Sequence, residues 1–340
     1  MPECGSQILL CDLPIRFDTY KGCSHGCCYC FAMRKTDISH VSNWEGIVAL
    51  KNFIDGKRNI ECAWCDWDIP LHWGGMSDPF QPIELKHRKS LEALNVFAET
   101  QYPFVVSTKN KLIASDQYLE LIKQCNCVVQ FSAVCSQYDK IEKGASTFQE
   151  RLAAVGTISK YKRVIIRVQP YMIGMFKEVM KNIDYFHEAG VYGVVFEGIK
   201  YFKSNPQMVK LGNDYVYPSK ILRQHFEFFK EKLHAKGMKF YSGENRLRSM
   251  GDDLCCCGID GMGWKSNTAN LNHYLFDRKN YTFTDSMRTS DGNQCFFAML
   301  QDSKAKKTMN EKTFEEVMNL YAKSSKFLKV LLPDSKNEIQ

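Results

Sequence analysis

The sequence predicts an α/β protein built on a parallel β-sheet, either an α/β barrel or an open doubly wound sheet. From about residue 68 onward, short apolar runs rich in β-branched and aromatic residues alternate with longer stretches of helical period. Each apolar run is nearly continuous until its C-terminal end, as expected of strands that are covered on both faces. Repeated units of this kind pair in parallel through right-handed crossovers.

The same pattern places the individual elements and divides the chain. Six strands are expected at 68–75, 104–110, 127–134, 163–170, 193–199 and 238–245. Helices are expected between them at 84–100, 115–125, 147–160, 175–189 and 218–236. We therefore predict one domain over 1–246, followed by an extension over 247–340. The extension is rich in Gly, Asn, Asp and Cys as far as about residue 300, and 309–331 has the period of an amphipathic helix.

Composition narrows the class of protein. A chain of 340 residues that is 44% hydrophobic can bury a large core. No apolar run approaches the roughly 20 residues of a membrane span, and the N-terminal residues lack the layout of a signal peptide. We therefore expect a soluble, cytoplasmic protein without a membrane partner. Fifteen cysteines in an unexported chain indicate metal or thiol chemistry rather than disulfides. The net charge of +7 permits a phosphate-bearing substrate but does not require one.

The segment KGCSHGCCYCFA, residues 21–32, carries the most specific pattern. Its spacing is Cys23-x3-Cys27-x2-Cys30, and three thiolates on a short loop can bind three irons of a cubane and leave the fourth iron open. A closed zinc site is the alternative, with His25 as the fourth ligand. The context favours the cubane, because the loop precedes a long βα series and Tyr29 directly precedes the last cysteine.

This loop resembles the signature of the radical S-adenosylmethionine (SAM) superfamily, CxxxCxxC with an aromatic residue before the third cysteine. Together with GGMSDPFQPIE (74–84), it resembles the branch that includes spore photoproduct lyase, over roughly residues 20–245. The resemblance implies a partial (β/α)6 TIM-like barrel and a [4Fe–4S] cluster on Cys23, Cys27 and Cys30. SAM would chelate the open iron through its amino and carboxylate groups.

The resemblance also implies the reaction class. An external electron donor such as flavodoxin or ferredoxin would reduce the cluster. Reductive cleavage of SAM would then give methionine and a 5′-deoxyadenosyl radical that abstracts hydrogen from a substrate, in a reaction of the lyase or oxidoreductase type. A barrel mouth can keep such a radical dry and positioned.

Polar residues follow the expected strands at their C-terminal ends, where parallel α/β proteins place their chemistry. Gly74 and Gly75 would let the backbone approach the cofactor closely. Ser77 or Asp78 could accept hydrogen bonds from its ammonium. A simple strand-to-loop turn is the alternative for this segment.

Three further cofactor contacts follow from the resemblance. Lys109 suits the SAM carboxylate because its ammonium is a mobile point charge. Ser132 matches a polar position that contacts the cofactor in the spore photoproduct lyase branch, and Tyr29 of the cysteine loop is expected at the same site.

Two charged residues interrupt apolar strands, where an unpaired charge is costly. Arg167 lies in VIIRVQP and Glu197 lies in VVFEGI. Arg167 is expected to meet the cofactor carboxylate, a substrate phosphate or Glu197 in a structural pair. Glu197 is a candidate catalytic residue.

The late cysteines form a second group, CCC at 255–257 and Cys295. Consecutive cysteines are not expected to point the same way, so two at most would serve one centre. Three interpretations stay open: a second iron–sulfur cluster, a hydrogen-atom donor at Cys257 for which spore photoproduct lyase gives a precedent, or buried small hydrophobes. The candidate ligands of the second cluster are Cys255, Cys256 and Cys295.

Two function classes remain at this stage. A radical SAM enzyme is the first, with a nucleic acid or nucleotide as substrate by resemblance to spore photoproduct lyase, or a peptide or protein if the late cysteines bind a cluster. A non-catalytic iron–sulfur or zinc protein is the second, and it would not bind SAM. Cys62 and Cys65, a lone CxxC, could join the late cysteines or form a site of their own.

Overall fold

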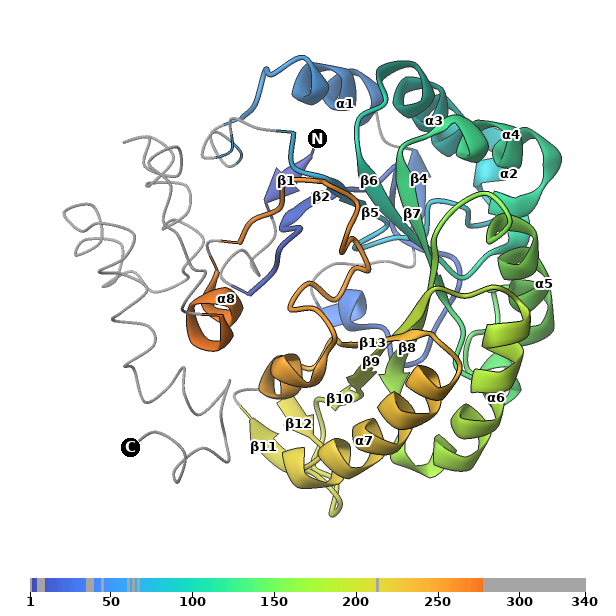
Figure 1. Cartoon of the computed structure of the whole chain (residues 1–340). Coiled ribbons are helices and arrows are strands. Elements are labelled where there is room, and N and C mark those ends of the chain that lie inside the picture. The colour runs from blue at the N-terminus through green and yellow to red at the C-terminus, as the bar shows by residue number, and fades with distance from the viewer. Residues whose placement is uncertain are drawn as a thin grey trace.

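A curved sheet of eight strands forms the centre of the molecule (Figure 1). The computed structural model describes residues 2–4, 10–34, 40–43, 46–59, 62, 65, 68–211, 214–268 and 270–277. The strand order is β1-β2-β5-β6-β7-β8-β9-β13, in which β1 (Glu3–Cys4) is antiparallel to β2 (Ile15–Phe17) and the other neighbours are parallel. Helices cover the outer side, so the partial TIM-like barrel is confirmed.

All six expected strands are present. They are β5 (Leu71–Trp73), β6 (Phe104–Thr108), β7 (Cys127–Ser132), β8 (Val164–Tyr171), β9 (Gly193–Gly198) and β13 (Lys239–Ser242). The expected helices are α2 (Glu84–His87), α3 (Lys89–Thr100), α4 (Asp116–Gln124), α5 (Phe148–Ile158), α6 (Phe176–Glu188) and α7 (Ser219–Ala235). The helix expected over 84–100 is divided in two because Arg88 adopts a left-handed backbone with φ of 52°.

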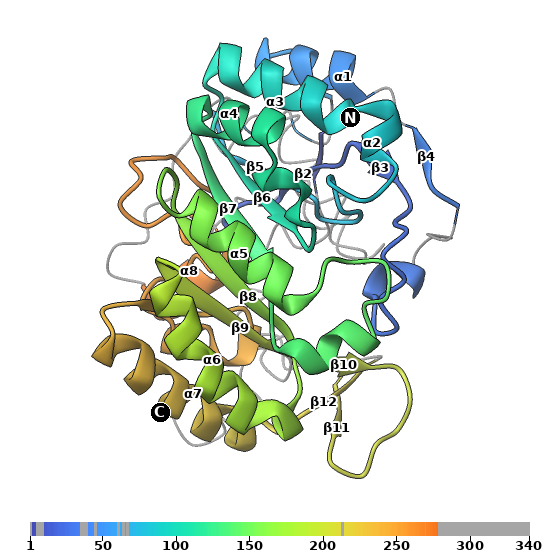
Figure 2. The ribbon, with the colours of Figure 1, turned by 90° about the vertical axis from the view of Figure 1, so that its right-hand side faces the viewer.

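Several short elements were not predicted from the sequence. β2 precedes the six expected strands, so the parallel part of the sheet has seven strands. The others are β3 (Tyr20–Lys21), β4 (Ser42–Asn43), α1 (Gly46–Ile54), η1 (Phe31–Arg34), η2 (Lys111–Ala114), η3 (Ser136–Lys140), η4 (Ile173–Met175), η5 (Asn245–Met250), α8 (Leu271–Phe276), and a small sheet of β10 (Lys200–Tyr201), β12 (Asp214–Val216) and β11 (Val209–Leu211). Most are too short to show a period. Figure 2 shows the small sheet at the edge of the barrel.

Aromatic side chains fill the layer between the sheet and its helices. Phe97 of α3 stacks on Phe104 of β6 with ring centroids 4.1 Å apart, and Phe196 of β9 stacks on Phe229 of α7 at 4.5 Å. Trp73 lies fully buried among Phe17, Phe80, Phe97 and Phe104. This packing holds the strands in register, so the loops after them are carried on a rigid support.

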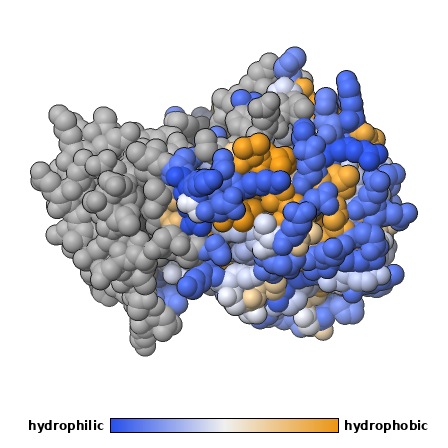
Figure 3. Space-filling model, turned by 90° about the horizontal axis from the view of Figure 1, so that it is seen from above, coloured by the Kyte–Doolittle hydropathy of each residue, from blue (hydrophilic) through white to orange (hydrophobic). Residues whose placement is uncertain are grey.

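The chain after η5 is irregular as far as α8, as expected for the start of the extension. Figure 1 shows this segment, in orange, within the curve of the sheet. The division into two domains at residue 246 stays a prediction, and Cys295 and the expected helix at 309–331 lie outside the described residues. None of the described helices is long and apolar enough to cross a membrane. The face seen from above is mainly hydrophilic around a central apolar area (Figure 3).

Candidate functional site

The cysteine loop, residues 22–30, lies beside the segments that follow β5 and β6. Gln81 holds its start: the fully buried side chain donates from Nε2 to the Gly22 carbonyl at 3.0 Å and accepts at Oε1 from the Ser24 N–H at 2.8 Å. The Cys28 N–H donates to the Ile141 carbonyl at 3.1 Å. The loop is therefore fixed from two sides by segments far away in the sequence.

The three thiols of the predicted cluster site lie near one another. The charge of Cys27 raises the pKa of Cys23, so these two thiols are close together. The charge of Cys30 likewise raises the pKa of Cys27. Burial is the larger cause, and it raises the pKa of Cys23 to about 12 and that of Cys27 to about 11. A cluster must therefore displace protons from these thiols when it binds. Lys109 lowers the pKa of Cys27 and places a positive charge beside this site.

In the described part of the chain, no three His, Cys, Asp or Glu side chains are grouped so as to hold a single metal ion. A cubane spreads its ligands over separate irons and does not need such a group. His25, the fourth ligand that a zinc site would use, has both ring nitrogens beside oxygen acceptors of the protein. The three thiols therefore fit a cluster with one open iron better than a zinc ion.

The glycine segment after β5 approaches the neighbouring strand closely. A Cβ atom at Gly74, whose φ is +88°, would lie 2.5 Å from the Ser107 carbonyl oxygen, so only glycine fits there. A Cβ atom at Gly75 would meet the Arg16 side chain at 3.0 Å. Gly74 thus permits a close approach between its own backbone and strand β6.

Asp18 and Ser77 fix the shape of this segment. Asp18 Oδ1 accepts from the Met76 N–H at 3.1 Å and the Ser77 N–H at 3.0 Å, and Ser77 Oγ donates to the Tyr20 carbonyl at 2.8 Å. Burial raises the pKa of Asp18 to about 7, although both N–H donors lower it. Sequence reasoning missed Asp18, because a lone aspartate after a three-residue strand carries no local signal.

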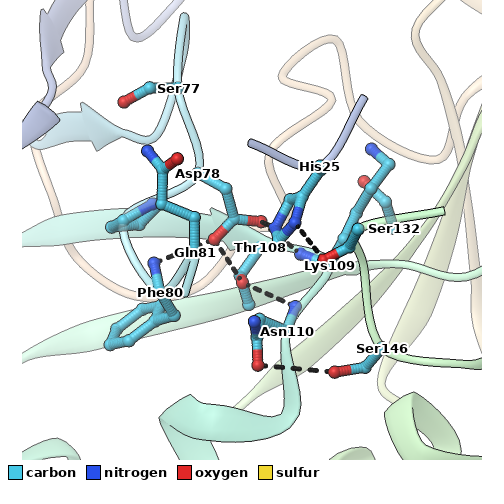
Figure 4. Close-up of polar contacts among 12 residues, drawn as sticks. His25, Ser77, Asp78, Phe80, Gln81, Thr108, Lys109, Asn110, Ser132 and Ser146 are labelled. Carbon is cyan, nitrogen blue, oxygen red and sulfur yellow. Dashed lines mark hydrogen bonds and ion pairs between the residues drawn. The ribbon is translucent and has the colours of Figure 1, made fainter. Parts of the chain in front are cut away.

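Asp78 contacts several groups of the protein itself, and its contact with the cofactor stays a prediction. Its carboxylate accepts from the Phe80 N–H at 2.9 Å, Thr108 Oγ1 at 2.8 Å and the Lys109 N–H at 2.6 Å, and its Oδ2 lies 3.0 Å from His25 Nε2 (Figure 4). Burial alone would raise the pKa of Asp78, but His25 and the two N–H groups lower it below its usual value. Protein donors thus take both oxygens, and Asp78 orients His25 and the start of Lys109.

Lys109 lies beside the cysteine loop, and its contact with SAM stays a prediction. Its Nζ is 6.0 Å from the centre of the Tyr29 ring, and burial lowers the pKa of Lys109 despite the neighbouring Cys27. The Tyr29 hydroxyl donates to Glu142. Tyr29 and Lys109 therefore line the same side of the cysteine loop.

A buried ion pair supports Tyr29 from behind. Glu142 Oε2 lies 2.5 Å from Arg151 Nη2, and Arg151 Nη1 donates to the Ser132 carbonyl at 2.7 Å. Burial raises the pKa of Glu142 in spite of Arg151. Ser132, at the end of β7, thus contacts this ion pair through its backbone carbonyl. Glu142 and Arg151 were missed by sequence reasoning.

A row of polar side chains crosses the strands inside the barrel. Arg167 donates from Nη1 to Ser107 Oγ at 2.8 Å and from Nε to Gln169 Oε1 at 3.0 Å. Gln169 in turn donates to Glu197, which also pairs with Lys200 at 2.5 Å. Gln169 therefore lies between Arg167 and Glu197, and the direct pair considered from the sequence does not form.

His72 of β5 begins this row. Its Nε2 lies 3.0 Å from Ser107 Oγ. Burial, and then the charges of Arg167 and Arg16, lower the pKa of His72 to about 3. The ring is therefore neutral and adds no positive charge to the interior.

The late cysteines lie at the other end of the barrel. Cys255 and Cys257 are buried in one apolar cluster with side chains of five strands, namely Val105, Val128, Ile165, Val195 and Tyr241. Lys109 follows Val105 by four residues along the same strand direction, a span of about 13 Å at the usual rise of a strand. Cys257 is nevertheless joined to the polar row: Gln130 Nε2 donates to the Cys257 carbonyl at 3.2 Å, and Gln130 Oε1 accepts from Ser107 Oγ at 3.0 Å. The role of Cys257 as a hydrogen-atom donor stays a prediction.

The three consecutive thiols do lie together, contrary to the expectation that one would face elsewhere. They occupy a turn, and the thiol of Cys257 interacts with those of Cys255 and Cys256. Cys11, which sequence reasoning did not consider, packs against the same group. Burial, and then the charge of Cys256, raise the pKa of Cys11 to about 12.

Comparisons with known proteins agree with this architecture. Spore photoproduct lyase complexed with dinucleoside spore photoproduct superposes with a TM-score of 0.55 and 16% identity, over 68% of this chain and 77% of that one. Streptococcus suis SuiB bound to precursor peptide SuiA superposes with a TM-score of 0.54 and 10% identity, over 88% of this chain and 67% of that one. The fold is thus that of the radical SAM class. The three spore photoproduct lyase structures superpose with TM-scores of 0.53 to 0.55 at 16% identity, which is a likeness of fold.

Sequence comparison gives a narrower match. An uncharacterised protein of Mycobacterium tuberculosis (strain H37Rv) is 28% identical over 160 residues, which cover 43% of this chain and 46% of that protein. An uncharacterised protein of Mycobacterium bovis matches to the same extent. The chain thus spans about half the length of these relatives. No family model matches the sequence.

Proposed function

We propose that the protein is a radical SAM enzyme whose Cys23, Cys27 and Cys30 hold a [4Fe–4S] cluster. The observation that carries the proposal is that Cys27 lies near Cys23, Cys30 and Lys109, at the strand ends of a fold shared with spore photoproduct lyase. When bound, the cluster supplies the electron that splits SAM and yields a 5′-deoxyadenosyl radical, which abstracts hydrogen from the substrate. An external electron donor such as flavodoxin or ferredoxin would supply the reducing electron.

The residues of the chain would divide the work of binding SAM. Lys109 would meet the SAM carboxylate, because a partly desolvated ammonium beside the cluster forms a strong charge-assisted hydrogen bond. The backbone of Gly74 to Ser77 would face the SAM amino group, with Asp18 and Asp78 holding the segment in place. Arg167 and Glu197 would face the substrate from the barrel interior, with opposite charges bridged by Gln169.

Detection of 5′-deoxyadenosine tests the reaction. Anaerobically reconstituted protein with dithionite and SAM should form 5′-deoxyadenosine, and the C23A/C27A/C30A variant should form none and lose the absorption of the cluster. Cys28→Ala is the matched control, since Cys28 is an exposed thiol in the same loop and is not a ligand in the proposed set. Product formation by the triple variant would overturn the proposal.

A nucleic acid or nucleotide is the proposed substrate. Its support is the similarity to spore photoproduct lyase, together with the net charge of +7. A peptide is the second candidate, supported by the comparable superposition of SuiB with its precursor peptide. Incubation in deuterated buffer with single-stranded DNA, nucleotides or peptides, followed by mass spectrometry of substrate and 5′-deoxyadenosine, separates the two.

A second cluster on the late cysteines belongs to the same proposal. It is supported by the grouping of Cys11 with Cys255, Cys256 and Cys257, beside the buried guanidinium of Arg248. Cys295, also expected as a ligand, lies outside the described residues. Iron analysis decides the question: about eight irons per chain, falling to four in C255A/C256A/C257A, support a second [4Fe–4S] cluster, and about four in the unaltered protein exclude it.

A further inference from the structure

We infer that His25 is a positioning residue that fixes the cysteine loop between the Asp78 carboxylate and the Gly144 turn. By doing so it would set the place of the cluster relative to the strand ends that bind SAM. The second part rests on the proposed function, whereas the fixing of the loop is a property of the protein chain alone. Figure 4 shows His25 and Asp78 side by side.

The His25 side chain is buried in a loop whose neighbouring residues are exposed. It is 1% exposed, whereas Ser24 and Gly26 on either side face solvent. His25 Nδ1 lies 2.8 Å from the Gly144 carbonyl oxygen, and Nε2 lies 3.0 Å from Asp78 Oδ2. The ring thus forms a hydrogen bond with the Gly144 turn through Nδ1 and an ion-pair contact with Asp78 through Nε2.

Gly144 makes the second contact possible. Its N–H donates to the His25 carbonyl at 2.9 Å, so the same two residues are joined twice. A Cβ atom at position 144 would lie 2.3 Å from the Ser24 carbonyl oxygen and 2.8 Å from His25 Cα. The turn can approach the loop this closely only because it has no side chain. The contact is therefore specific to the cysteine loop and is not a general feature of packing.

Asp78 connects this contact to the SAM side of the site. The oxygen that faces His25 also accepts from the Lys109 N–H at 2.6 Å, and the other oxygen accepts from Thr108 at 2.8 Å. One carboxylate thus ties the cysteine loop to the end of β6, from which the Lys109 side chain extends. Without His25, the buried Asp78 carboxylate would lose its ion-pair contact and the Gly144 carbonyl its hydrogen-bond partner, so the loop would be held less firmly.

The first test needs no iron. Cys27 is buried in the loop, so its alkylation by iodoacetamide in the iron-free protein reports how firmly the loop is held. We expect alkylation at least about tenfold faster in His25→Gln, measured by mass spectrometry of the Cys27 peptide. His234→Gln is the matched control, because its Nε2 lies 2.8 Å from Asp252 Oδ2 on the outside of the barrel. That variant should alkylate Cys27 at the unaltered rate.

The second test uses the reconstituted protein. We expect the change that SAM causes in the electron paramagnetic resonance spectrum of the reduced cluster to differ in His25→Gln, and its affinity for SAM to fall about tenfold. Asp78→Asn should change the spectrum and the SAM affinity in the same direction. The NH2 group that replaces one Asp78 oxygen cannot pair with His25 or accept from the Lys109 N–H. This variant also carries the test if His25→Gln does not fold.

The outcomes separate the inference from the proposed function. If Cys27 alkylation, the spectrum with SAM and the SAM affinity are all unaltered in both variants, His25 does not position the loop. If the unaltered protein takes up no cluster, the proposed function fails, and the alkylation rates alone then decide whether His25 fixes the loop.

Discussion

The two ends of the barrel hold cysteines by different means. At the cysteine loop, buried polar side chains make directed contacts: Gln81, His25, Asp78 and Glu142 each bind a specific backbone or side-chain group. At the late cysteines, apolar strand side chains pack against the thiols, and the buried guanidinium of Arg248 lies beside Cys256. The cysteine loop is thus held mainly by directed polar contacts and the late cysteines mainly by apolar packing. The comparison predicts that the two ends respond to different substitutions.

Breaking the buried ion pair behind Tyr29 should have the largest effect. Arg151→Met should lower the free energy of unfolding by about 3–5 kcal/mol, because Glu142 is left as an uncompensated buried charge. Urea unfolding measures this cost. The matched control is Lys111→Met, which breaks an exposed ion pair. The Lys111 side chain is 58% exposed and that of its partner Glu150 is 39% exposed, so this substitution should lower the free energy of unfolding by about 1 kcal/mol or less. Equal costs would show that the polar end is not held by this pair.

Removal of the Lys109 charge should mainly affect ligand binding. Lys109→Ala should weaken SAM binding by about 1–3 kcal/mol, the scale of one charge-assisted hydrogen bond. Calorimetry with the reconstituted protein measures it. Lys111→Ala, two residues further and exposed, should bind SAM like the unaltered protein. An unchanged affinity in Lys109→Ala would remove this residue from the site.

Overpacking should lower the stability of the apolar end, the segment that follows Cys255 to Cys257. A Cβ atom at Gly258 would lie 2.5 Å from the Ile165 side chain, whereas one at Gly261 would meet nothing within 4 Å. Both glycines have positive φ, of +71° and +68°, so the backbone cost of alanine is matched. Gly258→Ala should therefore destabilise the protein by about 1–3 kcal/mol more than Gly261→Ala. Similar unfolding midpoints would mean that the segment does not pack against β8.

A pH dependence of stability is expected at the polar end. The pKa of Asp18 is about 7 in the folded chain and lies near 3.8 in the unfolded chain, so the folded state binds the extra proton between these values. The contribution of Asp18 to stability is therefore fully present below pH 3.8 and is lost as the pH rises to about 7. Asp18→Asn should remove this loss, at most about 1.4 kcal/mol per pH unit. Parallel stability curves for both proteins would contradict the assignment.

The sequence predicted what depends on local pattern. β6 and β7 were found because apolar, β-branched and aromatic residues fill most of each run, and Cys23, Cys27 and Cys30 were found because their spacing is local. Gln81, Glu142 and Gly144 were not found, because they act on the cysteine loop across 57 to 119 residues of sequence. The late thiols were expected to diverge because consecutive side chains do not usually point the same way, but the chain makes a turn there.

The close approach of Gly144 to the cysteine loop has a consequence for protein engineering. A graft of residues 21–32 onto another scaffold would transfer the three thiols but not the acceptors that orient His25, since those acceptors belong to segments more than fifty residues away. The portable unit is instead a discontinuous one, the loop with Asp78, Gln81 and the turn around Gly144. Any transplant of this chemistry would have to reproduce three strand ends at once, so the barrel is itself part of the motif.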